Sequence, residues 1–98
     1  MLTLPPSVKI HIAIGPCDMR KQFDGLVVLV EQVLRQEARS GHLFVFLNKR
    51  ATHVRVIFWD RNGYCLVSKR LERGTFRVPW EAQESSERTH VEVEAAEL

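Results

Sequence analysis

The sequence predicts an α+β domain in which one long helix packs on a mainly antiparallel sheet, in the order β-α-β-β-β. Three observations predict this class: an alternating strand pattern near the start, a single helical stripe of apolar residues, and a series of extended runs around a hairpin signal. A helix needs a partner for its apolar stripe, and a sheet with one apolar face provides it.

The first strand is expected over residues 8–14, and Gly15-Pro16 ends it. Every second residue is apolar there, and a period of two places these residues on one face of a half-buried strand. Asp18 then suits the cap of a short turn. The residues that share the strand face are Val8, Ile10, Ile12 and Ile14.

A helix is expected from Asp24 to about Ala38, with Ser40-Gly41 as its stop. Its apolar residues recur at intervals of three and four, which is the pattern of a helix with one buried stripe. The stripe consists of Leu26, Leu29, Val30, Val33 and Leu34.

Extended runs follow the helix. The first is apolar on both faces, which favours a central place in the sheet. A polar, basic loop at 48–52 separates it from the second run, and Asp60-Arg61-Asn62-Gly63 is a strong hairpin signal between the second and third. A short edge strand is also expected at Thr75–Val78. The three main runs are Leu43–Leu47, His53–Trp59 and Tyr64–Leu71.

The hairpin allows two registers. A three-residue loop with a left-handed Gly63 places Lys69 opposite Arg55, and a two-residue loop at Asn62-Gly63 places Arg70 there. Like charges on facing strands cost a few tenths to about 1 kcal/mol. Both registers therefore predict a strained cationic pair that an anion would relieve.

Charge divides the chain in two. Residues 1–80 hold 13 Lys+Arg against six Asp+Glu, a net +7, while residues 81–98 hold one Arg against six Glu, a net −5; the sum is the +2 of the whole chain. We expect a single basic domain over 1–80 and a mobile acidic segment over 81–98, where few residues could anchor in a core. A basic body favours a polyanion partner.

Signals for an enzyme, a cofactor, a metal or a membrane span are missing from the sequence. The histidines show no metal-ligand spacing, the carboxylates form no evident cluster, and no apolar run reaches 18 residues. Cys17 and Cys65 lie far apart and form no paired motif, which suits free thiols in the cytoplasm. We therefore expect a non-catalytic cytoplasmic protein without cofactors.

The basic residues near the hairpin are the candidate nucleic-acid-binding residues. Arginine contacts phosphate in a bidentate way, and Trp59 and Tyr64 offer stacking surface, although strand aromatics more often belong to a core. A solvated face is the other interpretation of these charges. The candidates are Arg55, Lys69, Arg70, Arg73, Arg77, Lys49, Arg50 and Arg61.

Three blocks of sequence carry a resemblance to a known family. They are PCDMRKQFDGL from Pro16, SGHLFVFLNKR from Ser40 and FWDRNGYCLVSKRLERGTFRVP from Phe58. In this order and spacing they resemble the TnpB-type accessory protein, the second reading frame product of the sixty-six family of bacterial insertion sequences. The resemblance covers about residues 8–80. It implies a role in transposition beside a separate transposase that carries the catalytic residues.

Two functions follow from these observations. The first is a non-catalytic accessory protein that binds the DNA of the element ends through a basic strand face. The alternative is an adaptor that binds the transposase, or another element-encoded protein, without touching DNA. The sequence leaves the oligomeric state open.

Overall fold

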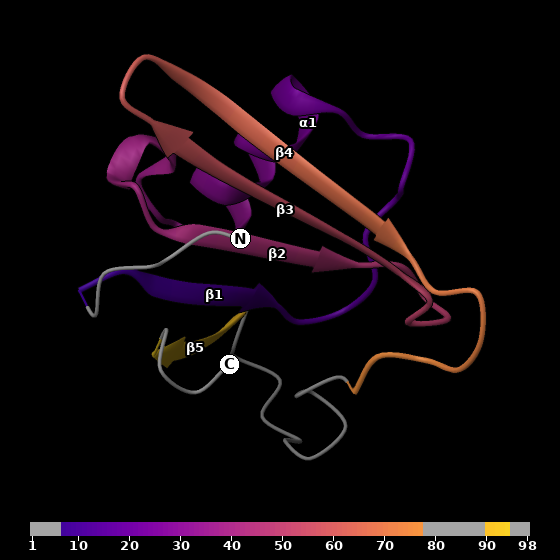
Figure 1. Cartoon of the computed structure of the whole chain (residues 1–98). Coiled ribbons are helices and arrows are strands. Elements are labelled where there is room, and N and C mark those ends of the chain that lie inside the picture. Colours follow the sequence, from indigo (N-terminus) through magenta and orange to yellow (C-terminus); the bar gives the residue numbers. More distant parts are fainter. Residues whose placement is uncertain (1–6, 78–89, 95–98) are drawn as a thin grey trace.

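A five-stranded sheet with helical segments on one face makes up the part of the chain that the computed structural model describes, which is residues 7–77 and the backbone of 90–94 (Figure 1). The strand order is β4-β3-β2-β1-β5. The strands are β1 (Lys9–Ala13), β2 (Leu43–Leu47), β3 (His53–Asp60), β4 (Gly63–Arg70) and β5 (His90–Glu94).

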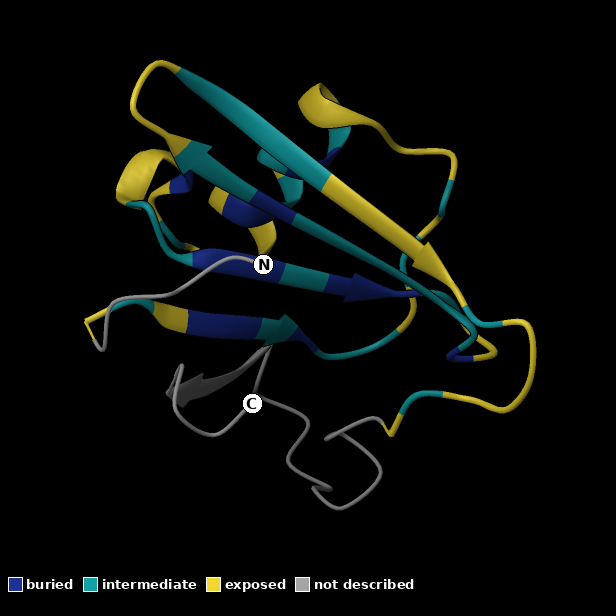
Figure 2. Ribbon diagram, viewed as in Figure 1, coloured by how far each residue is buried: buried dark blue, intermediate teal, exposed yellow. Residues whose placement is uncertain are grey.

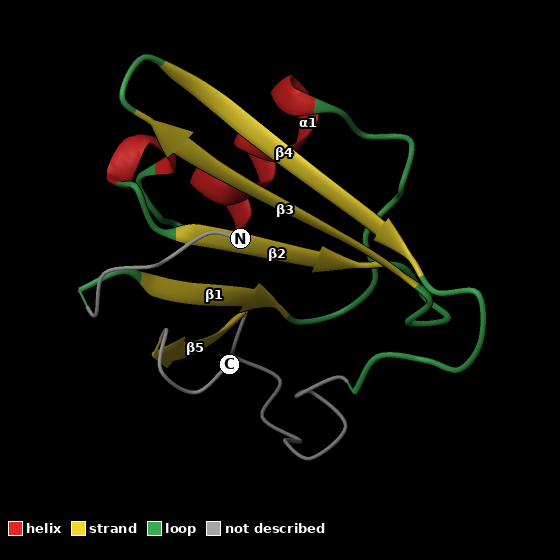
Figure 3. Cartoon of the chain, in the orientation of Figure 1, coloured by secondary structure: helices red, strands yellow, loops and turns green. Residues whose placement is uncertain are grey.

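The sheet is mixed. β1 and β2 are parallel, while the other three neighbouring pairs are antiparallel. Parallel neighbours need a long crossover, and here the helical region between residues 14 and 42 provides it. Figure 3 shows these helical segments together on one side of the sheet, so the fold is α+β with a single helical layer.

The expectation of one long helix is wrong. The α-helix α1 spans Phe23–Val28 and continues as a π-helix over Leu29–Val33, and a separate 3-10 turn at Ala38–Ser40 ends at Gly41. Arg35 stops the helix because its φ of 57° is left-handed, and the Gln36 N–H donates to the carbonyl of Val30 (3.0 Å) to close the last turn. Nothing in the apolar pattern signals a left-handed arginine.

Only part of the predicted stripe is buried. Leu26, Val30 and Leu34 are 0–2% exposed, whereas Val33 is 48% exposed. The buried positions recur every four residues along one side of the helix. They pack against Phe44 and other residues of the central strands, and each such side chain contributes about 1.5–3 kcal/mol by leaving water.

A second, smaller cluster lies on the opposite face of the sheet. Leu47 and Ala51 are buried there, and Ile12, Val54 and Phe76 pack against them. The short strand expected at Thr75–Val78 is not found in residues 75–77, and Val78 lies outside the described residues. Phe76 is an anchor rather than a strand residue, since its ring joins the cluster and its N–H donates to the carbonyl of Ala51 (2.6 Å).

Part of the acidic end belongs to the sheet. His90–Glu94 pairs antiparallel with β1 along the full length of that strand, so β1 is not an edge. The rest of the segment expected to be mobile, residues 81–89 and 95–98, lies outside the described residues. The boundary expected at residue 80 therefore does not mark the end of the sheet.

Candidate nucleic-acid interface

The β3–β4 hairpin has a register that differs from both predictions. Asp60 pairs with Gly63, which leaves Arg61-Asn62 as a two-residue loop. Arg61 has a φ of 54°, while Gly63 has no positive φ. A positive φ at the first loop position alone is the type II′ pattern, which normally uses glycine there. The prediction gave the left-handed conformation to Gly63, whereas Arg61, two residues earlier, adopts it.

The new register separates Arg55 from the other cations. Ser68 faces Arg55, and Lys69 faces Val54 on the opposite side of the sheet. The expected like-charge pair does not exist. Arg55 is half-buried on the helical side, where its Nη1 donates to the carbonyl oxygen of Lys21 (3.1 Å). It therefore ties the sheet to the segment before α1 and is not the centre of an exposed patch.

Six of the predicted residues do meet at one end of the sheet. β2 ends, β3 begins and β4 ends there, so the turn after β2 and the segment after β4 lie side by side (Figure 1). All six side chains are exposed. We call this group the basic end; it consists of Lys49, Arg50, Lys69, Arg70, Arg73 and Arg77.

Two backbone hydrogen bonds tether the segment after β4 to the turn before β3. The N–H of Leu71 donates to the carbonyl of Thr52 (2.8 Å), and the N–H of Phe76 donates to the carbonyl of Ala51. The Phe76 ring is half-buried in the smaller cluster, whereas the flanking residues of 72–77 are exposed (Figure 2). The loop that bears Arg73 is therefore held at both of its ends, and Arg77 directly follows the second tether.

The turn that carries Lys49 and Arg50 is organised by Asn48. The Oδ1 atom of Asn48 accepts hydrogen bonds from the N–H groups of Thr52 (2.9 Å) and His53 (3.0 Å), and its Nδ2 donates to the hydroxyl of Thr52. Ala51 adopts a left-handed φ of 56° to complete the turn. Asparagine side chains stabilise tight turns in this way, and both cations are left at the tip.

Among the residues that the structure describes, little negative charge compensates the basic end. Glu72 is the one acid among residues 48–53 and 69–77, against six cations. Within the described residues none of the six forms an ion pair. Arg20 behaves differently, because it pairs with Asp18 (2.9 Å) and holds the pKa of that carboxyl down at about 2. Its charge is thus neutralised locally.

The remaining candidate, Arg61, lies at the opposite end of the hairpin. Trp59 and Tyr64 meet there edge to face, with ring centroids 5.0 Å apart. The guanidinium of Arg39 lies 4.7 Å from the Trp59 ring centre. Since Arg39 covers that ring and both aromatics are half-buried, this end does not present the open stacking surface that the sequence suggested.

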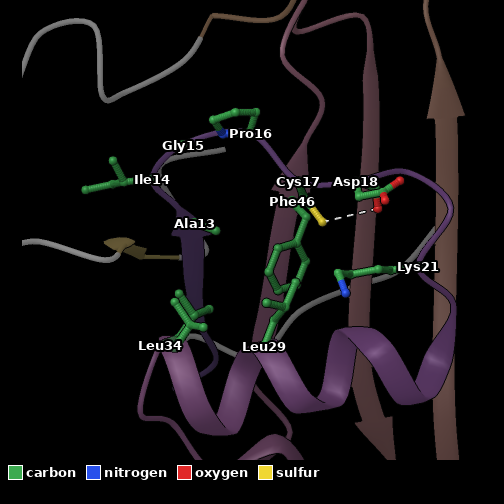
Figure 4. Close-up of a pocket in the computed structure, with 11 residues that line it drawn as sticks. Ala13, Ile14, Gly15, Pro16, Cys17, Asp18, Lys21, Leu29, Leu34 and Phe46 are labelled. Carbon is green, nitrogen blue, oxygen red and sulfur yellow. Dashed lines mark hydrogen bonds between the residues drawn. The ribbon is translucent and has the colours of Figure 1, made fainter.

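A pocket of about 150 Å³ that sequence reasoning missed opens between the end of β1 and the helix (Figure 4). Its lining is mostly apolar and includes Leu29, Val33 and Phe46, with Cys17 at one side. Burial raises the pKa of the Cys17 thiol, and Lys21 opposes that effect. The thiol is therefore a weak nucleophile at neutral pH.

Two histidines that are distant in sequence also come together. The His11 ring is buried and stacks on Phe44, and its centroid lies 5.8 Å from that of His42. In the described residues no three metal-binding side chains form a group that could hold an ion. No helix among the described residues is both long enough and apolar enough to cross a membrane.

The sequence comparisons identify the family. A family model described as IS66 Orf2 like protein matches residues 8–98. The chain belongs to this family. It is 40% identical over 79 residues to the uncharacterized protein y4hO of Sinorhizobium fredii, an alignment that covers 81% of the chain and 69% of that relative. The uncharacterized protein y4jC of the same organism is 40% identical over 72 residues, or 74% and 62% of the two chains. No solved structure matches.

Family membership confirms the resemblance seen in the three sequence blocks. It indicates an accessory protein of an insertion sequence, and the family is not a known enzyme family. The match also extends beyond the region that the blocks cover, since it includes the segment that forms β5.

Proposed function

We propose that this protein assists transposition of its element by binding the DNA of the element ends through the basic end. The observation that carries the proposal is the meeting of six exposed cations and one acid at one end of the sheet, where four of the cations lie on the two tethered loops and two are the last residues of β4. Loops held in place present their charges without a large loss of conformational entropy on binding.

Phosphate is the ligand chemistry that these residues suit best. Four of the six cations are arginines, whose planar guanidinium groups bind phosphate oxygens in a bidentate way. Four of the six lie on loops and the other two at the last positions of strand β4, so none of them is on a helix that could enter the major groove. The basic end is therefore suited to contacts along the DNA backbone, which position a protein, more than to reading of bases. Bond cleavage and joining are left to the separate transposase.

The test measures binding of the purified protein to a duplex of the element's terminal inverted repeat across a salt series. Each phosphate contact contributes about −0.9 to the slope of log affinity against log salt. Arg73→Gln with Arg77→Gln should shallow the slope by about two units. Arg61→Gln, at the far end of the hairpin, is the matched control and should leave it unchanged. Equal slopes for both variants would refute the proposal.

A second function, an adaptor for the transposase, is favoured by a different observation. The sheet face opposite the helix presents apolar residues beyond the smaller cluster, including Val56, Phe58 and the 48% exposed Val67. An apolar face of this kind suits a protein partner rather than DNA. Capture of the transposase by the wild type, lost in Val56→Lys but kept in the Arg73 and Arg77 variant, would support the adaptor.

A further inference from the structure

Strand β4 is an edge strand, and its first six residues carry no charged side chain to protect the edge. It is eight residues long, and all eight pair with β3 in an unbroken register, so no bulge interrupts it. It contains no proline, and within the described residues no segment pairs with its outer side. β5, at the other edge, is shorter and has Glu92 and Glu94 in its sequence. Long, regular edges with free backbone groups are templates for another strand.

The hairpin geometry shows which backbone groups of β4 point outward. In a two-residue hairpin the pair that flanks the loop, here Asp60 and Gly63, is hydrogen-bonded, and the direction alternates from there. The inward bond from the N–H of Leu71 to Thr52 agrees with this alternation. The outward residues are Tyr64, Leu66, Ser68 and Arg70.

We propose that the β4 edge binds the β4 edge of a second copy of this chain, antiparallel, about a twofold axis at Val67. Antiparallel pairing requires outward residues to face outward residues, which limits the axis to positions such as Leu66 or Val67. An axis at Leu66 engages three of the four outward residues of each copy. An axis at Val67 engages all four, for about eight hydrogen bonds in total.

The side chains of β4 are complementary to themselves in this register. Tyr64 faces the partner's Arg70, which provides a cation–π contact on the helical side. On the other side Val67, already exposed, faces the partner's Val67, so two apolar surfaces leave water together. The two cations of β4 are its last two residues. Antiparallel pairing therefore places the cations of one copy and those of the other at opposite ends of the interface. Charge therefore does not oppose the assembly.

The first test is the mass of the intact protein in solution across a concentration series. The wild type should pass from the 11.3 kDa chain to twice that mass. Ser68→Pro should remain at the lower mass, because proline removes an outward N–H yet leaves the β3 pairing intact. Ser68→Ala, which keeps the N–H but loses the same hydroxyl, is the control and should still dimerise. Circular dichroism establishes that each variant is folded.

The second test fixes the register. Val67→Cys in a Cys65→Ser background should form a disulfide-linked dimer under mild oxidation, since facing residues of a non-hydrogen-bonded pair lie about 4.5 Å apart. Cys65→Ser alone, which keeps Cys17, should not. A wild type that stays monomeric at every concentration overturns the proposal. So does a folded Ser68→Pro dimer, because another surface would then join the copies.

Discussion

Both ends of the β3–β4 hairpin carry cations that the sequence suggested as binding residues, but the two ends differ in how those cations are arranged and covered. At the turn, Arg61 stands beside an aromatic pair whose indole ring is already covered by Arg39. At the open end, six cations lie on the end of β4 and on two loops that are tied together by backbone hydrogen bonds and a half-buried phenylalanine. Local charge is therefore a weak guide to a binding surface. A group of charges that lie together and form no ion pair with their neighbours indicates a binding surface more reliably.

Removal of three cations from the basic end should have the largest effect. Arg70→Gln, Arg73→Gln and Arg77→Gln together should shallow the salt slope of DNA binding by about three units, because three phosphate contacts are lost. The fold should be intact, since all three side chains are exposed. Fluorescence anisotropy with a labelled duplex measures the slope. A slope equal to that of the wild type would remove the distinction between the two ends.

Phe76→Ala tests whether the tether matters. The change should destabilise the protein by about 2 kcal/mol, roughly half the cost for a fully buried phenylalanine, because this ring is half-buried. It should also weaken DNA binding, since the loop with Arg73 and Arg77 loses its anchor. Urea unfolding and anisotropy give the two numbers. Phe76→Leu keeps an apolar anchor and should recover most of both.

Asn48→Ala should act on the neighbouring turn. Three hydrogen bonds of the side chain are lost, and we expect a cost of about 1–3 kcal/mol, because backbone N–H groups are left without their acceptor. Thermal unfolding checks the stability. Asn48→Asp keeps the acceptor oxygen and should cost less; an equal loss in both variants would show that the Oδ1 contacts are not what organises the turn.

Arg55→Met should lower the stability of the fold without changing DNA binding. The change removes a cation that sequence reasoning placed at the centre of the patch, yet the salt slope should stay within experimental error of the wild type. Stability should fall modestly, because the bond to the Lys21 carbonyl is lost. A slope shallower by one unit would return Arg55 to the interface.

The smallest effect concerns Asp18. Its pKa should be about 2, and Arg20→Ala should return it toward the usual range, because the guanidinium is the main cause of the shift. A depressed folded pKa contributes stability that is present above the unfolded value and is lost as the pH falls through about 2. Carbon-detected NMR titration follows the carboxyl directly. An unshifted pKa in the wild type would mean that the ion pair between Arg20 and Asp18 does not form in solution.

The sequence predicted the first four strands, but it failed at the chain's later strands and where a residue adopts an unusual backbone conformation: no strand is found at residues 75–77, and β5 lies in the segment expected to be mobile. Alternation, a run apolar on both faces and the hairpin signal together placed these strands to within a residue at each end. The helix end and the hairpin register were wrong, because Arg35 and Arg61 take left-handed conformations that the pattern assigns to glycine. Six of the eight site residues are brought together, since loop positions follow from strand positions. Arg55 was misplaced by the same register error.

The central place of β1 has a consequence for folding during synthesis. β3 and β4 are joined by a two-residue loop and can pair as soon as both have left the ribosome. β1 is made first, yet its neighbours in the sheet begin at Leu43 and His90. Both edges of β1 can therefore be paired only after the residues up to Glu94 have been made. We expect slow closure around β1, rather than formation of the hairpin, to be the step that leaves a nascent chain exposed to chaperones and proteases.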